Sequence, residues 1–258
     1  MRFFIALSFC LVTSLMFAQK VKENTEIKEV NSIFSKFDVR VTVGFNLGGL
    51  SPIPLPSNIR KVKSYNPTFA PSVGAEIKYN FHKKWSVGIN PRLDYKGMKV
   101  KDSVVYFHTL IQQGSGNDTA TFEGAFSGTN ETESKNLYLG APVFVEFTPG
   151  KNWHYRLGGY MAFLLKGKFE GTVSDGYIRN GGSLGEKVEI SSASFDFSDK
   201  IRKTDYGFYA GARRSFGNHW SADVSLQWGL RSTFPSSFTG ISFPMYNIFA
   251  QIGAGYQF

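Results

Sequence analysis

Residues that could act in catalysis are few in this chain, and they are scattered. A hydrolase needs a nucleophile next to a base, and a carboxylate that orients the base. Asp102, Ser103 and His108 are the one set of these residue types that lies close together in a predicted outer loop. The remaining histidines share a place in or beside short turns: His82, His154 and His219. We therefore expect no catalytic residues, with a lipid-modifying hydrolase centred on His108 as the alternative.

Metal and cofactor binding have equally little support. No spacing of His, Cys, Asp or Glu is typical of a zinc site or of an EF-hand calcium loop. The glycine-rich stretches "NGGSLGE" and "GSGN" lack the preceding strand and the following helix that a phosphate-binding loop requires. We expect no metal and no cofactor.

A different chemistry is indicated by charged residues that recur inside otherwise apolar segments. They are Arg40, Glu76, Lys78, Arg92, Asp94, Lys96, Glu146, Arg156, Lys166, Asp205, Arg213, Asp223 and Arg231. If these side chains share one interior, they form ion pairs that fill it. Basic residues outnumber acidic ones in this set, so a narrow anion-preferring pore is the alternative to a filled interior.

Eight segments, seven of which carry these charges, alternate with a period of two, as strands do. They are residues 37–47, 68–81, 85–97, 136–147, 153–167, 205–216, 220–231 and 248–258. One face of each is apolar and the other is small, polar or charged, with Phe249 as an exception in the last segment. This contrast is typical of a barrel whose apolar face contacts lipid and whose polar face lines the lumen.

The connections between these segments alternate in length. The short ones are "HKK", "TPGKN" and "GNH", and the long ones cover roughly residues 50–67, 100–134, 168–203 and 232–243. Aromatic residues flank each short turn, as expected at a lipid–water boundary. This predicted periplasmic girdle consists of Phe81, Trp85, Phe147, Trp153, Phe216 and Trp220. The pattern predicts an all-β fold: an eight-stranded antiparallel transmembrane up-and-down β-barrel with short periplasmic turns and long extracellular loops.

The two ends of the chain fit this prediction. Residues 1–18 have the basic start and the apolar run of a signal peptide, and Cys10, the one cysteine, lies within it. Residues 19–36 form a predicted periplasmic leader with a rough helical spacing of apolar residues, and residues 37–258 form the barrel. The last strand, with Tyr256 and Phe258, is expected to close the ring against the first strand and to contact the barrel-assembly machinery.

Three quoted stretches resemble a known family. The blocks "YLGAPVFVEFTPGKNWHYRLGGYMAFLL" and "KTDYGFYAGARRSF", and the closing "GAGYQF", are similar to the PorT-like outer-membrane β-barrel family of Bacteroidetes. The resemblance covers roughly residues 37–258. It implies an outer-membrane barrel, and one namesake of that family serves type IX secretion. The residue before the proline in "GAPVFVEF" is smaller than the family pattern leads us to expect.

The expected function is that of a membrane anchor with a filled polar lumen, acting as a non-enzymatic surface-binding or secretion-assembly protein. Its partners are then outer-membrane lipid and lipopolysaccharide, together with a secretion-system partner or an extracellular ligand at the loops. Despite the formal charge of +9 at pH 7, we expect no nucleic-acid partner, because an exported basic protein meets more anionic lipid and polysaccharide than nucleic acid. A small-solute pore and a lipid-modifying enzyme stay open as alternatives.

Overall fold

The computed structural model describes residues 36–113, 120–182 and 184–258. The predicted signal peptide lies outside this part of the chain, as does the predicted leader apart from Lys36. The described residues form one twelve-stranded antiparallel sheet and a 3-10 helix, η2 (Ser198–Lys200). The strands are β1 (Phe37–Pro52), β2 (Ile59–Asn66), β3 (Pro71–His82), β4 (Trp85–Ile89), β5 (Arg92–Gln113), β6 (Ala120–Phe147), β7 (Trp153–Lys166), β8 (Phe169–Asn180), β9 (Lys187–Asp196), β10 (Thr204–Phe216), β11 (Trp220–Ser232) and β12 (Met245–Gln257).

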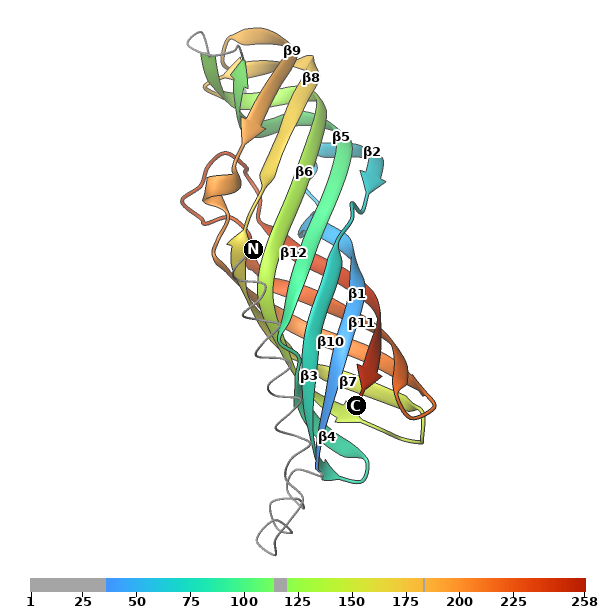
Figure 1. Cartoon of the computed structure of the whole chain (residues 1–258). Coiled ribbons are helices and arrows are strands. Elements are labelled where there is room, and N and C mark those ends of the chain that lie inside the picture. The colour runs from blue at the N-terminus through green and yellow to red at the C-terminus, as the bar shows by residue number, and fades with distance from the viewer. Residues whose placement is uncertain (1–35, 114–119, 183) are drawn as a thin grey trace, which may run out of the picture.

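The lower part of the molecule is a closed barrel (Figure 1). Strand pairing runs from β1 through β3, β4, β6, β7, β10, β11 and β12 and returns to β1. The closing pair, β1 with β12, extends from Arg40 opposite Gln257 to Pro52 opposite Met245. The last strand therefore joins the first, as the alternation of its residues predicts, and no free sheet edge is left in the lower barrel.

The strand count differs from the predicted eight, which is not confirmed. One predicted segment is divided into β4 and β5 at Asn90 and Pro91, because proline has no N–H to donate to a ladder. The other additional strands lie where long loops were expected: β2 within residues 50–67, and β8 and β9 within residues 168–203. Strands β5 and β6 also continue through most of residues 100–134, so the prediction of loops in these regions was wrong.

These additional strands build an extension above the barrel (Figure 1). The extension pairs β5 with β6, β6 with β8, and β8 with β9. Gln112 of β5 lies opposite Ser194 of β9, so the sheet curls back on itself. Its interior is packed with buried apolar side chains, among them Phe107, Ile111 and Phe126. The polarity of the sheet is thus reversed relative to the barrel below: apolar inside and mixed outside.

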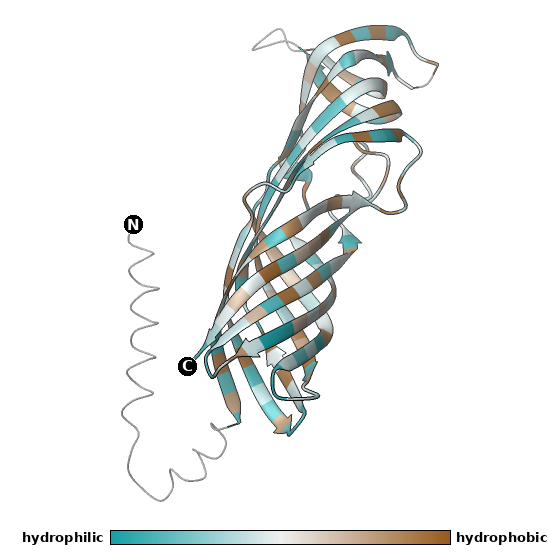
Figure 2. Cartoon of the chain, turned by 90° about the vertical axis from the view of Figure 1, so that its right-hand side faces the viewer, coloured by the Kyte–Doolittle hydropathy of each residue, from teal (hydrophilic) through white to brown (hydrophobic). Residues whose placement is uncertain are grey.

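In the barrel itself, apolar and polar residues alternate along each strand (Figure 2). Large apolar side chains face outward and are exposed, for example Val43, Val143 and Ile252 at 54%, 50% and 60%. Charged side chains face inward and are buried, for example Glu146 at 0% and Arg213 at 3% exposure. A water-soluble protein has the opposite arrangement, whereas a barrel in lipid requires this one.

Candidate functional site

The centre of the lower lumen is Glu76 on β3, which is buried. Its Oε2 lies 2.9 Å from Nη2 of Arg40 on β1 and 3.1 Å from Nη1 of Arg156 on β7. Its Oε1 accepts a hydrogen bond from Nη2 of Arg213 on β10. Three guanidinium groups from three different strands therefore converge on one carboxylate, which ties opposite walls of the barrel together.

A second carboxylate, Glu146 on β6, extends the same layer. Lys78 Nζ lies 3.0 Å from its Oε1, and Arg156 Nε lies 2.9 Å from its Oε2. His154 Nδ1 lies 3.3 Å from Oε1, on the side of the short turns. Arg156 thus joins Glu146 to the cluster around Glu76.

The third carboxylate of the layer is Asp223 on β11. Its Oδ1 lies 3.0 Å from Arg213 Nε, 3.2 Å from Arg40 Nη2 and 3.4 Å from Arg156 Nη1. Every arginine of the layer thus contacts at least two carboxylates. We call this set the lower ion-pair layer: Arg40, Glu76, Lys78, Glu146, Arg156, Arg213 and Asp223.

An upper polar layer lies further along the same strands. Arg92 Nε donates to Asp94 Oδ2 at 2.8 Å, and Arg92 Nη1 donates to Gln251 Oε1 at 2.8 Å. Asn46 Nδ2 lies 3.3 Å from Asp94 Oδ1. Between the two layers is a cavity of about 20 Å³, lined in part by Arg92 and Arg156. That volume holds roughly one water molecule.

Lys96 sits at the upper end of this layer in a cage of aromatic rings. Its Nζ lies 4.9, 5.2 and 5.6 Å from the ring centroids of Tyr160, Tyr138 and Phe249, and 3.6 Å from Asp205 Oδ2. Such cation–π contacts stabilise an ammonium group that has lost its water. The cage explains why Phe249 breaks the polar face of the last strand: its ring covers the Lys96 charge.

Two predicted members of the lumen set lie elsewhere. Lys166 is exposed, because a register shift between Leu137 opposite Lys166 and Tyr138 opposite Leu164 changes the side to which it points. Arg231 is half-buried and donates a hydrogen bond to Thr204 Oγ1, with no carboxylate partner among the described residues. Of the predicted set, the structure brings together all but these two.

Aromatic side chains mark the turn side of the barrel. Trp85 lies opposite Phe147 with ring centroids 4.7 Å apart, and Phe216 lies opposite Trp220. The girdle residues Phe81, Trp85, Trp153, Phe216 and Trp220 are all exposed. Tyr256 of the last strand packs edge-on against Trp220 at 5.0 Å and against Phe258 at 5.3 Å. The predicted girdle residues therefore lie along one rim and point outward.

The opposite limit of the apolar band is marked by a change of residue type. On β6 the outward residues pass from Leu137 to Lys135, and on β5 they pass from Tyr95 to Lys99. Lys99 forms an exposed ion pair with Glu131 at 2.7 Å. From the girdle to this limit, these two walls cover residues 137–147 and 85–95, which is about the 9–11 residues that a tilted transmembrane strand needs. The extension therefore rises beyond the hydrocarbon layer.

The catalytic candidate is not assembled. His108 Nε2 lies 3.3 Å from Glu123 Oε1, while Asp102 accepts a hydrogen bond from Asn130 at 2.8 Å. In the described part of the chain, no hydrogen bond joins Asp102, Ser103 and His108 to one another. Across residues 36–113, 120–182 and 184–258 there is also no cluster of three or more His, Cys, Asp or Glu side chains placed to hold a metal ion. The same residues contain no helix long and apolar enough to cross a bilayer.

Sequence reasoning missed the aromatic side chains of the lumen. Tyr138, Tyr160, Tyr209 and Phe249 are all buried on the inner face. The available signal was that each large aromatic residue interrupts a face that is otherwise small or polar. Such an interruption indicates that a neighbouring strand supplies a partner, although it does not say which one.

Comparisons with known proteins agree with this architecture. The chain matches the family model of the outer membrane protein beta-barrel domain over residues 17–235. A comparison with curated proteins finds no match. One similar solved structure is Ail, the attachment invasion locus protein of Yersinia pestis, in complex with the heparin analogue sucrose octasulfate, at 12% identity over 86% of this chain and 99% of that chain, with a TM-score of 0.39. Another is the N-terminal β-barrel domain of Pseudomonas aeruginosa OprF, at 11% identity over 86% of this chain and 97% of that chain, with a TM-score of 0.30.

The family model covers well over half of the chain, and the exposed apolar band with its aromatic rim is the surface that such a barrel presents to lipid. The protein is located in the bacterial outer membrane, in contact with membrane lipid. The chain belongs to the outer membrane protein beta-barrel domain family.

Proposed function

We propose that this protein is a closed outer-membrane anchor that carries a surface-binding extension. In this proposal β4 and β5 count as one wall of the barrel, so eight walls cross the membrane: β1, β3, β4/β5, β6, β7, β10, β11 and β12. An eight-stranded barrel is just wide enough for side chains to fill its interior. The observation that carries the proposal is the lower ion-pair layer, which crosses the lumen from wall to wall.

The extension supplies the binding surface in this proposal. Loops and projections on a rigid scaffold are where binding residues concentrate. Here the projection is a continuous sheet, because β5 and β6 run without a break from the membrane to its upper end. A sheet of this kind holds a binding surface at a fixed height above the lipid.

The alternatives have weaker support. An anion-preferring pore needs an open path, and the space between the polar layers is about 20 Å³. Membership of the PorT-like family and a role in type IX secretion assembly stay hypotheses that rest on the quoted sequence blocks. Within the described residues, no feature favours secretion assembly over surface binding. A contact through residues 19–36 would involve a segment that lies almost entirely outside those residues.

Conductance in planar bilayers tests the proposal. Purified protein is added at neutral pH, and folding is checked by the mobility shift that barrels show on gels with and without heating. We expect no steady current from folded protein. A steady current that prefers anions, and that falls when Arg92 and Arg156 are replaced by Gln, would instead establish the pore.

A further inference from the structure

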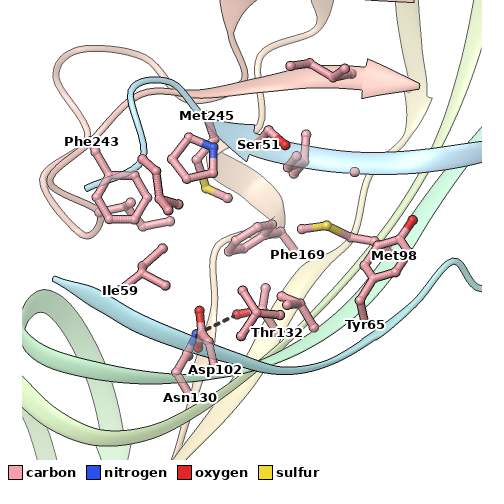
Figure 3. A pocket seen from close by; sticks show the side chains of 18 of the residues that line it. Ser51, Ile59, Tyr65, Met98, Asp102, Asn130, Thr132, Phe169, Phe243 and Met245 are labelled. Atoms are coloured by element: carbon pink, nitrogen blue, oxygen red, sulfur yellow. Dashed lines mark hydrogen bonds between the residues drawn. The ribbon is translucent and has the colours of Figure 1, made fainter. Parts of the chain in front are cut away.

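A large cavity lies where the barrel meets the extension (Figure 3). Its volume is about 560 Å³, which is within the range of about 300–1,000 Å³ typical of small-molecule sites. Its inner walls are apolar and include Leu50, Met98, Phe107, Phe169 and Met245, all of them buried. A space of this size and lining accepts a long apolar chain.

The cavity also reaches the lipid-facing side of the barrel. Its walls include Leu47 on β1 and Ile248 on β12. Ile248 lies opposite Trp228, which is exposed on the outer face, and facing residues of an antiparallel pair point to the same side. The wall residues Val62 and Tyr65 on β2 are exposed as well. The cavity is therefore continuous with the outer apolar surface.

The passage between the inside and the outside is a seam between β1 and β2. β1 pairs with β3 only up to Phe45 opposite Pro71, although it pairs with β12 to its end. Beyond Phe45, Asn46 N on that edge of β1 donates a backbone hydrogen bond to Ala70 O, which lies outside any strand. Tyr65 Oη donates to Gly48 O at 2.7 Å and accepts from Gly48 N at 3.1 Å.

Backbone groups at the level of lipid must be hydrogen-bonded within the protein, and along this edge of β1 Ala70 O and the Tyr65 hydroxyl group bond Asn46 and Gly48 in place of a neighbouring strand. The seam lies at the outer end of the apolar band, next to the lipid-facing residue Leu47. One tyrosine side chain bridges the two strands there. The seam is therefore the natural route between the cavity and the outer leaflet.

The inner end of the cavity carries a small polar group of side chains. Asn130 Nδ2 donates to Asp102 Oδ1 at 2.8 Å and to Thr132 Oγ1 at 3.1 Å. Asn130 Oδ1 is buried and has no hydrogen-bond partner among the described residues. The Asn130 residue is 5% exposed. A buried acceptor without a partner costs stability, so this oxygen atom favours a ligand that donates a hydrogen bond.

We propose that this cavity binds a single-chain amphiphile with an uncharged, hydrogen-bond-donating head, such as a long-chain alcohol. The head lies at Asn130, and the chain runs past Met98 and Phe169 towards the seam at Tyr65. An anionic head is disfavoured, because the carboxyl group of Asp102 lies beside the same polar atoms. This inference rests on the proposed surface-binding function and names its ligand.

The test is a binding measurement on the full mature chain in phosphatidylcholine nanodiscs. The probes are parinaryl alcohol and parinaric acid, whose fluorescence rises when the chain enters a rigid apolar site. Empty nanodiscs give the background. We expect saturable binding of the alcohol above background, and binding of the acid at pH 7 that is at least about tenfold weaker, because the Asp102 carboxyl group beside the head disfavours a second negative charge.

Two variants separate binding from folding. Val100→Phe places a phenyl ring in the cavity and is expected to weaken binding of the alcohol at least about tenfold, while Val143→Phe on the lipid face is the matched control.

The proposal is overturned if the alcohol binds no better than to empty nanodiscs, or if it binds Val100→Phe as tightly as the wild type. Equal or tighter binding of the acid overturns the assignment of an uncharged head. If the alcohol binds only after residues 19–35 are deleted, that segment and not an amphiphile is the occupant of the cavity in the intact chain, and the proposal is overturned. None of these results bears on the proposal that the lumen is closed, because the conductance measurement tests that proposal separately.

Discussion

Replacing Glu76 by glutamine is the sharpest test of the lower ion-pair layer. The substitution keeps the size and shape of the side chain and removes its charge. Arg40, Arg156 and Arg213 then face a neutral amide, and all three guanidinium groups stay buried at 3–6% exposure. Removal of one partner from a buried ion pair costs about 3–5 kcal/mol, because the remaining charge keeps its desolvation cost.

Two carboxylates, Glu146 and Asp223, remain within reach of the same arginines and offset part of the loss. We therefore expect the lower end of that range, about 3 kcal/mol, or a shift of roughly two decades in the folding equilibrium constant. Unfolding by urea is measured on protein folded into short-chain phosphatidylcholine vesicles, with tryptophan fluorescence as the signal.

The matched control is Glu133→Gln on the outer wall of β6. Glu133 contacts Lys135 at 2.6 Å and Lys168 at 3.7 Å in a solvent-exposed ion pair, and such a pair contributes about 0–1 kcal/mol. A second substitution, Arg213→Met in the Glu76→Gln background, is expected to restore part of the stability, because it removes one of the positive charges that then outnumber the carboxylates Glu146 and Asp223 in the layer. Equal stability of Glu76→Gln and Glu133→Gln would refute the account of the layer.

Two further predictions concern the upper part of the molecule. Gly48 has a φ of +151°, and a Cβ there would lie 2.1 Å from Ile248 O, so Gly48→Ala is expected to destabilise the β1–β12 closure by about 1–3 kcal/mol in the same urea assay, with Gly44→Ala as the milder control. If Gly48→Ala and Gly44→Ala have the same free energy of unfolding, β1 does not approach β12 as tightly at Gly48 as this account requires. Burial raises the pKa of the Asp102 carboxyl group, an effect that the hydrogen bond from Asn130 only partly offsets. The folded state therefore holds this proton more tightly than the unfolded state, and the stability that it contributes is complete below the ordinary pKa of about 4 and is lost as pH rises through the raised pKa. The protection of amides in β5 and β6, which is their exchange rate relative to the intrinsic rate at the same pH, is expected to fall over that interval in the wild type but not in Asp102→Asn, and an equal loss of protection in both proteins would contradict this.

The sequence predicts well which face of each barrel strand points to lipid and which points to the lumen. Outward residues are apolar and inward residues are polar or charged, so the sequence alternates with a clear period of two. Residues 37–47 show this plainly, and in the structure Val43 points outward while Arg40 points inward. The closure of β12 on β1 follows from the same pattern. These features depend on local alternation alone, which is visible in one chain.

The extension could not be predicted in this way. Its outer face is mixed and its inner face is largely apolar, in contrast to the barrel, and irregularities interrupt the alternation. Register shifts lie between Val104 and Phe107 and between Ser127 and Thr129, and Tyr106 has a φ of +51°. Along these strands the apolar face switches from the outside to the inside, and the two-residue alternation skips a residue. A search for one uninterrupted alternation therefore finds no strand there and indicates a loop.

The partners within the lumen depend on register, which local sequence does not determine. Lys96 lies next to Phe249 although more than half of the chain separates them. Lys166 shows that even a local change of register defeats the prediction. The register of β6 with β7 shifts by one residue next to Lys166, so its side chain lies on the exterior and not in the predicted lumen.

The central claim is that the lumen is closed, and the accessibility of a cysteine placed inside it tests this most directly. The chain without residues 1–18 has no cysteine, so Ser225→Cys, in the small cavity between the two polar layers, is the only thiol of that variant. Ser236→Cys in an exposed loop is the control. With a charged methanethiosulfonate reagent added to protein in nanodiscs, we expect complete labelling at residue 236 and none at residue 225 on the same timescale. Labelling of residue 225 at the rate of the control would show that water and ions pass the ion-pair layer, and it would contradict the closed anchor.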